Sequence, residues 1–259
     1  MVSSSARGIA LLSGSGGTGR TTAALNISHT LAGQGAKVLL ADMCFGWGGL
    51  ISFAADPPTF EVLLDSDADP ERIMTHATGG FDLLTSNPPE FLEPSVDDYK
   101  KFAWLISRLS LNYDFIVYDT PASGHPLSLL AAGMSRKVLL FIRPDAISFA
   151  ASYRLLKSLN AEGINERVST VFTFVKSAAH AASLKTRFDL VTAKFLGLRL
   201  ASSGFIGVSE ALRGEEFVTV TLDSNSIKTI ENFSLDESLL LQNETVHGRH
   251  SRMHPGPSQ

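Results

Sequence analysis

The chain has 259 residues, 44% of them hydrophobic, which is enough apolar material for the core of one large domain. The formal net charge of −4 and a pI of about 6.0 exclude an overall basic field, so no nucleic-acid partner is expected, although a local basic patch is compatible with these values. The single cysteine, Cys44, excludes an intramolecular disulfide framework and fits a reducing compartment.

The N-terminal segment and the lengths of the apolar runs favour a cytoplasmic protein. Residues 1–8 lack the basic-then-apolar layout of a secretory signal. Arg136 and Lys137 divide the longest apolar candidate, so no run reaches the length of a membrane span. We therefore expect a cytoplasmic chain whose contact with the inner membrane is at most peripheral.

Short apolar runs alternate along the chain with segments of helical periodicity. The expected strands are Ile9–Leu12, Val38–Ala41, Phe81–Leu84, Phe115–Tyr118, Val138–Ile142 and Val168–Val175. Helical spacing is clear over Val96–Leu109 and weaker over Tyr153–Leu159, and Gly33 and Gly35 predict the end of the first helix. Continuous apolar strands separated by helices predict a single α/β domain, with a mostly parallel sheet and helices on both faces.

The C-terminal part of the chain differs from the rest. We assign residues 1–233 to the α/β domain, because periodicity fades from about Ser234, and we predict that residues 234–259 form a disordered tail. His247, His250 and His254 lie in this tail at irregular spacing among glycine and proline, which disfavours a metal site there.

A glycine-rich segment, Ser13–Thr22, joins the first expected strand to the first expected helix. Such a turn lets backbone N–H groups converge on a phosphate, and the helix dipole adds positive potential. Arg20 stands where a P-loop has lysine, and its planar guanidinium is wider than an ammonium group. The alternative interpretation is a glycine-rich turn that binds nothing. The candidate nucleotide-binding residues of the segment are Gly14, Ser15, Gly16, Gly17, Thr18, Gly19, Arg20, Thr21 and Thr22.

Four segments resemble the MinD/ParA family of P-loop ATPases. Gly16–Thr22 resembles the family's deviant Walker A loop, and Val38–Gly46 resembles its segment of the Asp-x-Asp type. Tyr113–Ala122 is similar to its Walker B strand and switch, and Pro144–Ser148 is most similar to the flagellar-number branch, FlhG or FleN. The pattern covers most of residues 8–233 and implies a P-loop NTPase-like fold.

The resemblance also implies which ligands the site holds. ATP and Mg²⁺ are the cofactors of the family. Asp42 lies in the segment that resembles the Asp-x-Asp type, so we expect it to join the loop in the nucleotide site. The hydroxyl of Thr21 and the carboxylates of Asp42 and Asp119 would hold Mg²⁺ if nucleotide binds.

Four residues depart from the family pattern. Ser15 stands in place of a signature lysine that reaches a partner's nucleotide, and Arg20 replaces the P-loop lysine. Cys44 occupies the position of the family's catalytic aspartate, which orients the attacking water, and Thr173 replaces an asparagine that reads adenine. Loss of one cationic group costs phosphoryl transfer about a thousandfold, so the pattern implies weak ATP binding with little or no hydrolysis. In the alternative, the substitutions are tolerated and the chain is an active ATPase switch.

These features favour a MinD/FlhG-like regulator of the placement or assembly of a cell-envelope machine, with the flagellum as the favoured machine. It would act through protein contacts with that machine. An active switch ATPase that dimerises around ATP is one alternative, and a BcsQ-like or CpaE-like accessory subunit of cellulose secretion or pilus assembly is another. A homodimer is compatible with the family, but Ser15 has no charge to reach a second chain, so we expect no ATP-sandwich dimer.

Four further features have open interpretations. The apolar residues Ile227, Ile230 and Phe233 accompany several acidic residues and a single lysine, which makes this segment a poor lipid anchor and favours docking onto its own domain. His125 follows the expected switch. It is interpreted either as a solvated residue or as a neighbour of the γ-phosphate. Cys44 is a small packed residue or a reactive thiol, and residues 47–50 form a packed loop or a contact surface.

Overall fold

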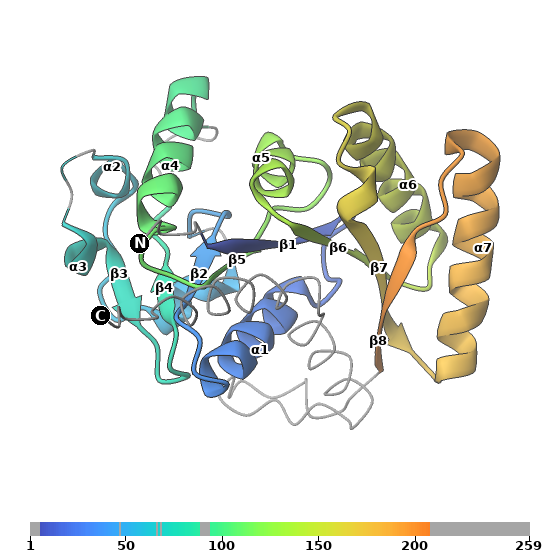
Figure 1. Cartoon of the computed structure of the whole chain (residues 1–259), viewed down its shortest axis with the longest axis horizontal. Helices are drawn as coiled ribbons and strands as arrows, with labels where there is room; N and C mark the ends of the chain where they lie inside the picture. Colours follow the sequence, from blue (N-terminus) through green and yellow to red (C-terminus); the bar gives the residue numbers. More distant parts are fainter. Residues whose placement is uncertain (1–5, 47, 66, 68, 89–93, 208–259) are drawn as a thin grey trace, which may run out of the picture.

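An eight-stranded sheet forms the centre of the computed structural model, which describes residues 6–46, 48–65, 67, 69–88 and 94–207 (Figure 1). The strand order is β3-β4-β2-β5-β1-β6-β7-β8, and every neighbouring pair is parallel except β3 with β4. The strands are β1 (Arg7–Ser13), β2 (Val38–Asp42), β3 (Met74–His76), β4 (Asp82–Leu84), β5 (Phe115–Asp119), β6 (Lys137–Ile142), β7 (Val168–Val175) and β8 (Ala201–Gly207).

Helices cover both faces of this sheet. Figure 1 shows α1 on one face and α4, α5, α6 and α7 on the other. The α-helices are α1 (Arg20–Gly33), α2 (Phe60–Leu63), α3 (Pro70–Ile73), α4 (Val96–Leu109), α5 (Pro126–Met134), α6 (Ala146–Ala161) and α7 (Ala178–Leu196). Two short 3₁₀ helices complete the described elements: η1 (Gly49–Phe53) and η2 (Asn165–Arg167).

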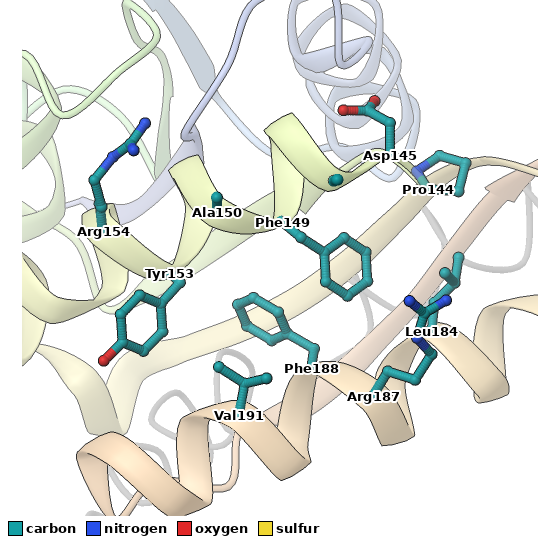
Figure 2. Close-up of a pocket in the computed structure, with 11 residues that line it drawn as sticks. Pro144, Asp145, Phe149, Ala150, Tyr153, Arg154, Leu184, Arg187, Phe188 and Val191 are labelled. Atoms are coloured by element: carbon teal, nitrogen blue, oxygen red, sulfur yellow. The ribbon is translucent and has the colours of Figure 1, made fainter.

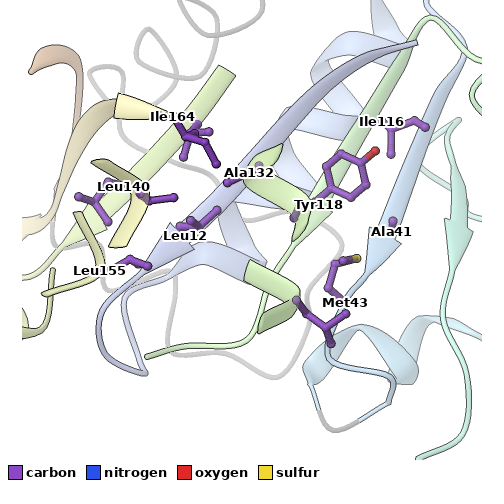
Figure 3. Close-up of a cluster of buried hydrophobic side chains, with 14 of the residues drawn as sticks. Leu12, Ala41, Met43, Ile116, Tyr118, Ala132, Leu140, Leu155 and Ile164 are labelled. Carbon is purple, nitrogen blue, oxygen red and sulfur yellow. The ribbon is translucent and has the colours of Figure 1, made fainter. Parts of the chain in front are cut away.

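Alternation along the strands divides the core into two layers. On β1, Ala10 and Leu12 belong to the larger cluster, which α4, α5, α6 and α7 cover (Figure 3), whereas Ile9 and Leu11 belong to the cluster covered by α1. Successive strand residues point to opposite faces, and both faces are buried here, so the strands read as continuous apolar runs.

Polar side chains at the helix starts fix where several helices begin. Ser95 and Asp98 form a reciprocal capping box at α4, while Asp145 caps α6 and Ser177 caps α7 through their side-chain oxygens. These caps satisfy backbone N–H groups that lack partners within the helix. The caps of α6 and α7 lie within three residues of the carboxyl ends of β6 and β7.

The α/β fold with a mostly parallel sheet and helices on both faces is confirmed, and all six expected strands are present within one residue or two of their expected bounds. The strands β3 and β8 and the helices α2, α3, α5 and α7 were not expected. Residues 208–259, which include the expected tail and its three histidines, lie outside the described residues. Among the described helices, none combines the length and apolar character needed to cross a membrane.

Candidate nucleotide site

The glycine-rich loop between β1 and α1 lies at the carboxyl ends of the central parallel strands. Gly17 and Gly19 have φ angles of 66° and 77°, in the left-handed region that favours glycine. Gly19 is the N-cap of α1, and no side chain caps this helix, unlike α4, α6 and α7. The backbone N–H groups at the start of α1 are therefore free of a competing side-chain cap, as a phosphate-binding helix start requires.

Two glycines of the loop have different surroundings. A Cβ atom on Gly14 would lie 2.1 Å from the carbonyl carbon of Ala151 and 2.3 Å from the nitrogen of Ser152, both on α6. A Cβ on Gly16 would meet no atom within 4 Å. The requirement for glycine at position 14 therefore comes from the close approach of α6, whereas Gly16 is exposed at the tip of the loop.

A buried hydroxyl–carboxylate pair joins α1 to β5. The Thr21 hydroxyl donates to Oδ2 of Asp119 at 2.6 Å, and Asp119 is only 1% exposed. Burial raises the pKa of Asp119 to about 6, although the Thr21 hydrogen bond and the Arg20 charge both oppose this shift. Oδ1 of Asp119 is buried and has no hydrogen-bond partner among the described residues. Such an orphaned carboxylate oxygen is the kind of group that a cation or an ordered water satisfies.

These groups fit a Mg²⁺ ion bound with phosphates. Mg²⁺ in phosphate sites takes one or two protein oxygens and completes its shell with water and phosphate oxygens. The Thr21 hydroxyl and the Asp119 carboxylate would be those oxygens, and the ion would neutralise phosphate charge. Within the described part of the chain, no cluster of three or more His, Cys, Asp or Glu residues could hold a metal unaided.

Asp42 is placed beside Asp119 but has other partners. The two aspartates are register neighbours at the ends of β2 and β5. Oδ1 of Asp42 accepts from the backbone N–H of Cys44 at 2.9 Å, and Oδ2 accepts from the Thr85 hydroxyl at 2.8 Å and from Gly46 N–H at 3.4 Å. Burial raises the pKa of Asp42, and these hydrogen bonds oppose the shift. Asp42 thus fixes the turn after β2, and its role toward Mg²⁺ stays a prediction.

Cys44 is a half-buried free thiol in that turn. Burial, together with the charges of Asp42 and Asp119, raises its pKa above the ordinary thiol value. A Cβ on Gly48 would lie 3.3 Å from the Cβ of Cys44 and 3.6 Å from its sulfur, so Gly48 packs closely against the thiol. A thiol held neutral beside two carboxyl groups behaves as a packed residue, which disfavours the reactive-thiol interpretation.

Arg20 points toward the segment after β5. Its Nη1 donates to the carbonyl oxygen of Thr120 and lies 3.3 Å from the Thr120 hydroxyl, which itself donates to the Leu11 carbonyl at 2.7 Å. Burial lowers the pKa of Arg20 while Asp119 opposes the shift, and the guanidinium remains charged. Arg20 therefore connects the loop to the switch segment, and its buried Nε–H has no partner among the described residues.

The structure brings most of the expected site residues together. Arg20, Thr21, Asp42, Cys44 and Asp119 interact by hydrogen bonds or by charge. Ser15 and Thr22 are half-buried and Thr18 is buried, and buried hydroxyl oxygens of Ser15 and Thr18 lack a described partner. Thr173 lies on β7 with a buried, unpartnered hydroxyl, and no contact places it against the loop.

Two residues at the site were missed in the sequence. Thr120 accepts from Arg20, and Arg143 reaches Gly17, as described below. Each directly follows an apolar strand, β5 or β6. Polar residues after parallel strands gather at one edge of the sheet, and this was the signal available for both.

His125 acts as the N-cap residue of α5, where its Nδ1 accepts from the backbone N–H of Leu127 at 3.2 Å. This local bond gives the half-buried histidine a structural role at the end of the switch segment. Of residues 47–50, Trp47 lies outside the described residues, and Leu50 is buried in the core.

Comparison with known proteins identifies the family of the chain. Residues 6–170 match a family described as an AAA domain, of the ParA/MinD type. The antiactivator FleN of Pseudomonas aeruginosa is 24% identical over 209 residues, which are 79% of this chain and 75% of FleN. Soj, the chromosome-partitioning ATPase of Thermus thermophilus, is 27% identical over 65% of this chain and 68% of its own.

Solved structures share the fold. A ParA family ATPase from Chlorobium tepidum superposes with a TM-score of 0.68 at 20% identity, over 88% of this chain and 98% of that chain. MinD from Pyrococcus horikoshii, solved with Mg-ADP, has a TM-score of 0.66 at 20% identity, over 91% and 97% of the two chains. The chain belongs to the ParA/MinD-type AAA domain family.

Proposed function

We propose that this protein regulates the placement or assembly of a cell-envelope machine, the flagellum being favoured, through protein contacts and with impaired ATP binding and hydrolysis. One observation carries the proposal: phosphate- and magnesium-directed groups persist, whereas a thiol, Cys44, follows Asp42 where the family has its water-orienting carboxylate. The similarity to the antiactivator FleN supports a regulatory role.

Weak binding of Mg-ATP follows from the groups present. The open start of α1, Thr21 and the orphaned oxygen of Asp119 favour phosphate and Mg²⁺. Arg20, however, already donates to Thr120, so a phosphate would compete with this contact or share the guanidinium with it. Thr173 offers a single hydroxyl where the family has an amide that reads adenine, which lowers selectivity for the base.

Little hydrolysis follows from the turn after β2. A carboxylate can accept a proton from water and orient it, but the neutral Cys44 thiol is a weak acceptor. The neighbouring Asp42 cannot simply replace it, because both of its oxygens already accept hydrogen bonds from the protein. The site is therefore suited to holding phosphates and poorly suited to activating water.

A groove between α6 and α7 supports the proposed protein contacts. Figure 2 shows Phe149 of α6 and Phe188 of α7 facing one another in this groove, which has a volume of about 550 Å³. Elsewhere on the same two helices, Ile147 is 77% exposed and Leu190 is 66% exposed, so α6 and α7 both present apolar side chains to solvent.

The charges around the groove indicate what kind of partner it suits. Arg154 and Arg187 line it and make no ion pair with any described residue, whereas its one lining acid, Asp145, pairs with Arg143. A protein segment with apolar anchors and flanking acidic residues complements this surface.

Binding, turnover and mass measurements on the purified chain test the proposal together. We expect calorimetry to show weak Mg-ATP binding, a phosphate-release assay to show little turnover, and light scattering with a non-hydrolysable ATP analogue to show no increase in mass. Rapid turnover with a doubled mass would establish the switch ATPase instead. Flagellar, cellulose or pilus genes beside the coding gene would separate the three machines.

A further inference from the structure

Arg143 directly follows β6, and its side chain extends to the tip of the glycine-rich loop. Its Nη1 lies 3.4 Å from the carbonyl oxygen of Gly17, to which it donates. A Cβ atom on Gly17 would lie 3.3 Å from the same nitrogen, so the guanidinium rests directly against the loop. This places a permanent positive charge two residues along the loop from Ser15, across a sequence separation of 126 residues.

Two side chains, Asp145 and Phe174, hold this guanidinium in place, and a hydrogen bond to Ser148 fixes the backbone of Arg143. Nε of Arg143 pairs with Asp145 at 3.3 Å, and the guanidinium carbon lies 5.6 Å from the ring centre of Phe174, at the end of β7. The backbone N–H of Arg143 donates to the Ser148 hydroxyl at 2.9 Å, and Asp145 caps α6 by accepting from Ser148 N–H. The side chain is 44% exposed, and an arginine has five N–H donors, of which these contacts use two.

Unpartnered polar atoms occur in the same part of the loop. Thr18 is 1% exposed, and its hydroxyl oxygen has no partner among the described residues. The hydroxyl oxygen of Ser15 is likewise buried without a described partner. Buried hydroxyl groups are normally hydrogen-bonded, so this segment carries groups that a ligand would satisfy.

We infer that Arg143 is a phosphate-binding residue of this site, which supplies from the same chain the second cation that Ser15 does not provide. The ligand class is a nucleoside di- or triphosphate, since a guanidinium fork matches phosphate oxygens in pairs. The inference rests on the proposed nucleotide binding. Because Arg20 is turned toward Thr120, Arg143 is the more exposed of the two arginines at the loop. A charge supplied by the same chain also removes the need for a second chain around the nucleotide.

Calorimetry on the full chain with Mg-ATP, and separately with inorganic tripolyphosphate, tests this role. Arg143→Ala should weaken both ligands about tenfold, since a charge-assisted hydrogen bond is lost at a partly exposed position. Arg143→Lys keeps the charge without the planar fork, so it should recover part of the affinity. Arg199→Ala is the matched control: Arg199 is exposed between α7 and β8, and its change should leave both affinities unaltered. Thermal melting of each variant checks folding.

The outcomes separate this inference from the proposed function. Equal affinities in the wild-type chain and Arg143→Ala would overturn the inference and leave the proposed nucleotide binding intact. Equal losses in Arg143→Ala and Arg143→Lys, accompanied by a lower melting temperature, would show that the arginine only supports the loop and would also overturn it. A wild-type chain that binds neither ligand would overturn the proposed binding itself, and the inference with it.

Discussion

The loop side of the site, formed by β1 and α1, and the turn after β2 carry different chemical groups. The loop side holds an uncapped helix start, the Thr21–Asp119 pair and two arginines, of which Arg20 donates to Thr120 and Arg143 to Gly17. In the turn, both carboxylate oxygens of Asp42 accept hydrogen bonds from the protein, and Cys44 is a thiol with a raised pKa. We therefore expect binding and turnover to depend on separate parts of the site, so that one can weaken without the other.

The largest expected effect comes from restoring both sides at once. The triple variant Ser15→Lys, Arg20→Lys and Cys44→Asp restores the groups that are typical of the family. These are a cross-chain charge, a compact ammonium and a water-orienting carboxylate. Because each missing group costs phosphoryl transfer severely, turnover should rise about a thousandfold over the wild-type chain. Each single variant should gain little, since residues that act as a unit are strongly non-additive. A phosphate-release assay measures the rates, and light scattering with ATP should now show a dimer.

A triple variant that folds and binds ATP but does not turn it over would place the defect outside these three positions. If it folds but no longer binds ATP, the loop side has also lost its function, and the contrast between the two sides is wrong.

The next effect concerns the glycines within the loop side. Gly14→Ala should lower the free energy of unfolding by about 3 kcal/mol, because its Cβ would lie 2.1 Å from the backbone of α6 and the helix must shift. Gly16→Ala is the matched control, with open space around it, and should change stability by less than about 0.5 kcal/mol. Urea unfolding of the two variants measures the difference. Equal stabilities would show that α6 moves freely away from the loop.

Local sequence patterns predicted most of the strands and the glycine-rich loop. They did not predict which residues far apart in the chain are in contact. The loop, β1 and the early part of α1 are contiguous in the sequence. Gly17, Gly19 and Thr21 could therefore be identified as candidate site residues from the local motif. The Thr21–Asp119 pair joins residues 98 apart, and only the family resemblance suggested that both belong to one site. The contact of Arg143 with Gly17 joins residues 126 apart, and the local pattern shows only that a polar residue directly follows an apolar strand.

Physical reasons also explain why some strands were not predicted from the sequence. The edge strand β8 reads Ala-Ser-Ser-Gly-Phe-Ile-Gly, whose small polar residues and glycines have low strand propensity, and its pairing with β7 provides the structure. The edge strand β3 has three residues, too few for periodicity. By contrast, α7 carried a readable signal: its buried residues Ala181, Leu184 and Phe188 recur at helical spacing behind the Ser177 cap.

A smaller effect distinguishes the two aspartates that meet at the sheet edge. Asp119→Asn should weaken Mg-ATP binding about tenfold, because it removes a charged oxygen from the expected Mg²⁺ position, while binding of ATP without Mg²⁺ should change little. Asp42→Asn is the control, since its oxygens hold the turn after β2, and it should mainly lower the free energy of unfolding, by about 2 kcal/mol. Calorimetry with and without Mg²⁺ compares them. The opposite pattern would assign the Mg²⁺ ligand to the β2 side.

The smallest effect is a pH dependence of Mg-ATP affinity that arises from Asp119. Burial raises its pKa to about 6, above the ordinary value for aspartate, so the folded chain holds this carboxyl largely protonated below that pH. Mg²⁺ requires the ionised form, so affinity should fall as the pH decreases from 7.5 to 5.5, by about fourfold from the change in ionised fraction.

The phosphates of ATP titrate in the same range, and Asp119→Asn isolates the part that belongs to the protein, since this variant retains only the dependence of the ligand. The affinity ratio of wild-type chain to variant should therefore shrink toward low pH, because protonated aspartate and asparagine are both neutral there. A ratio that stays constant across this range would mean that Asp119 does not contact the ion. The loop side would then bind phosphate without the help of β5.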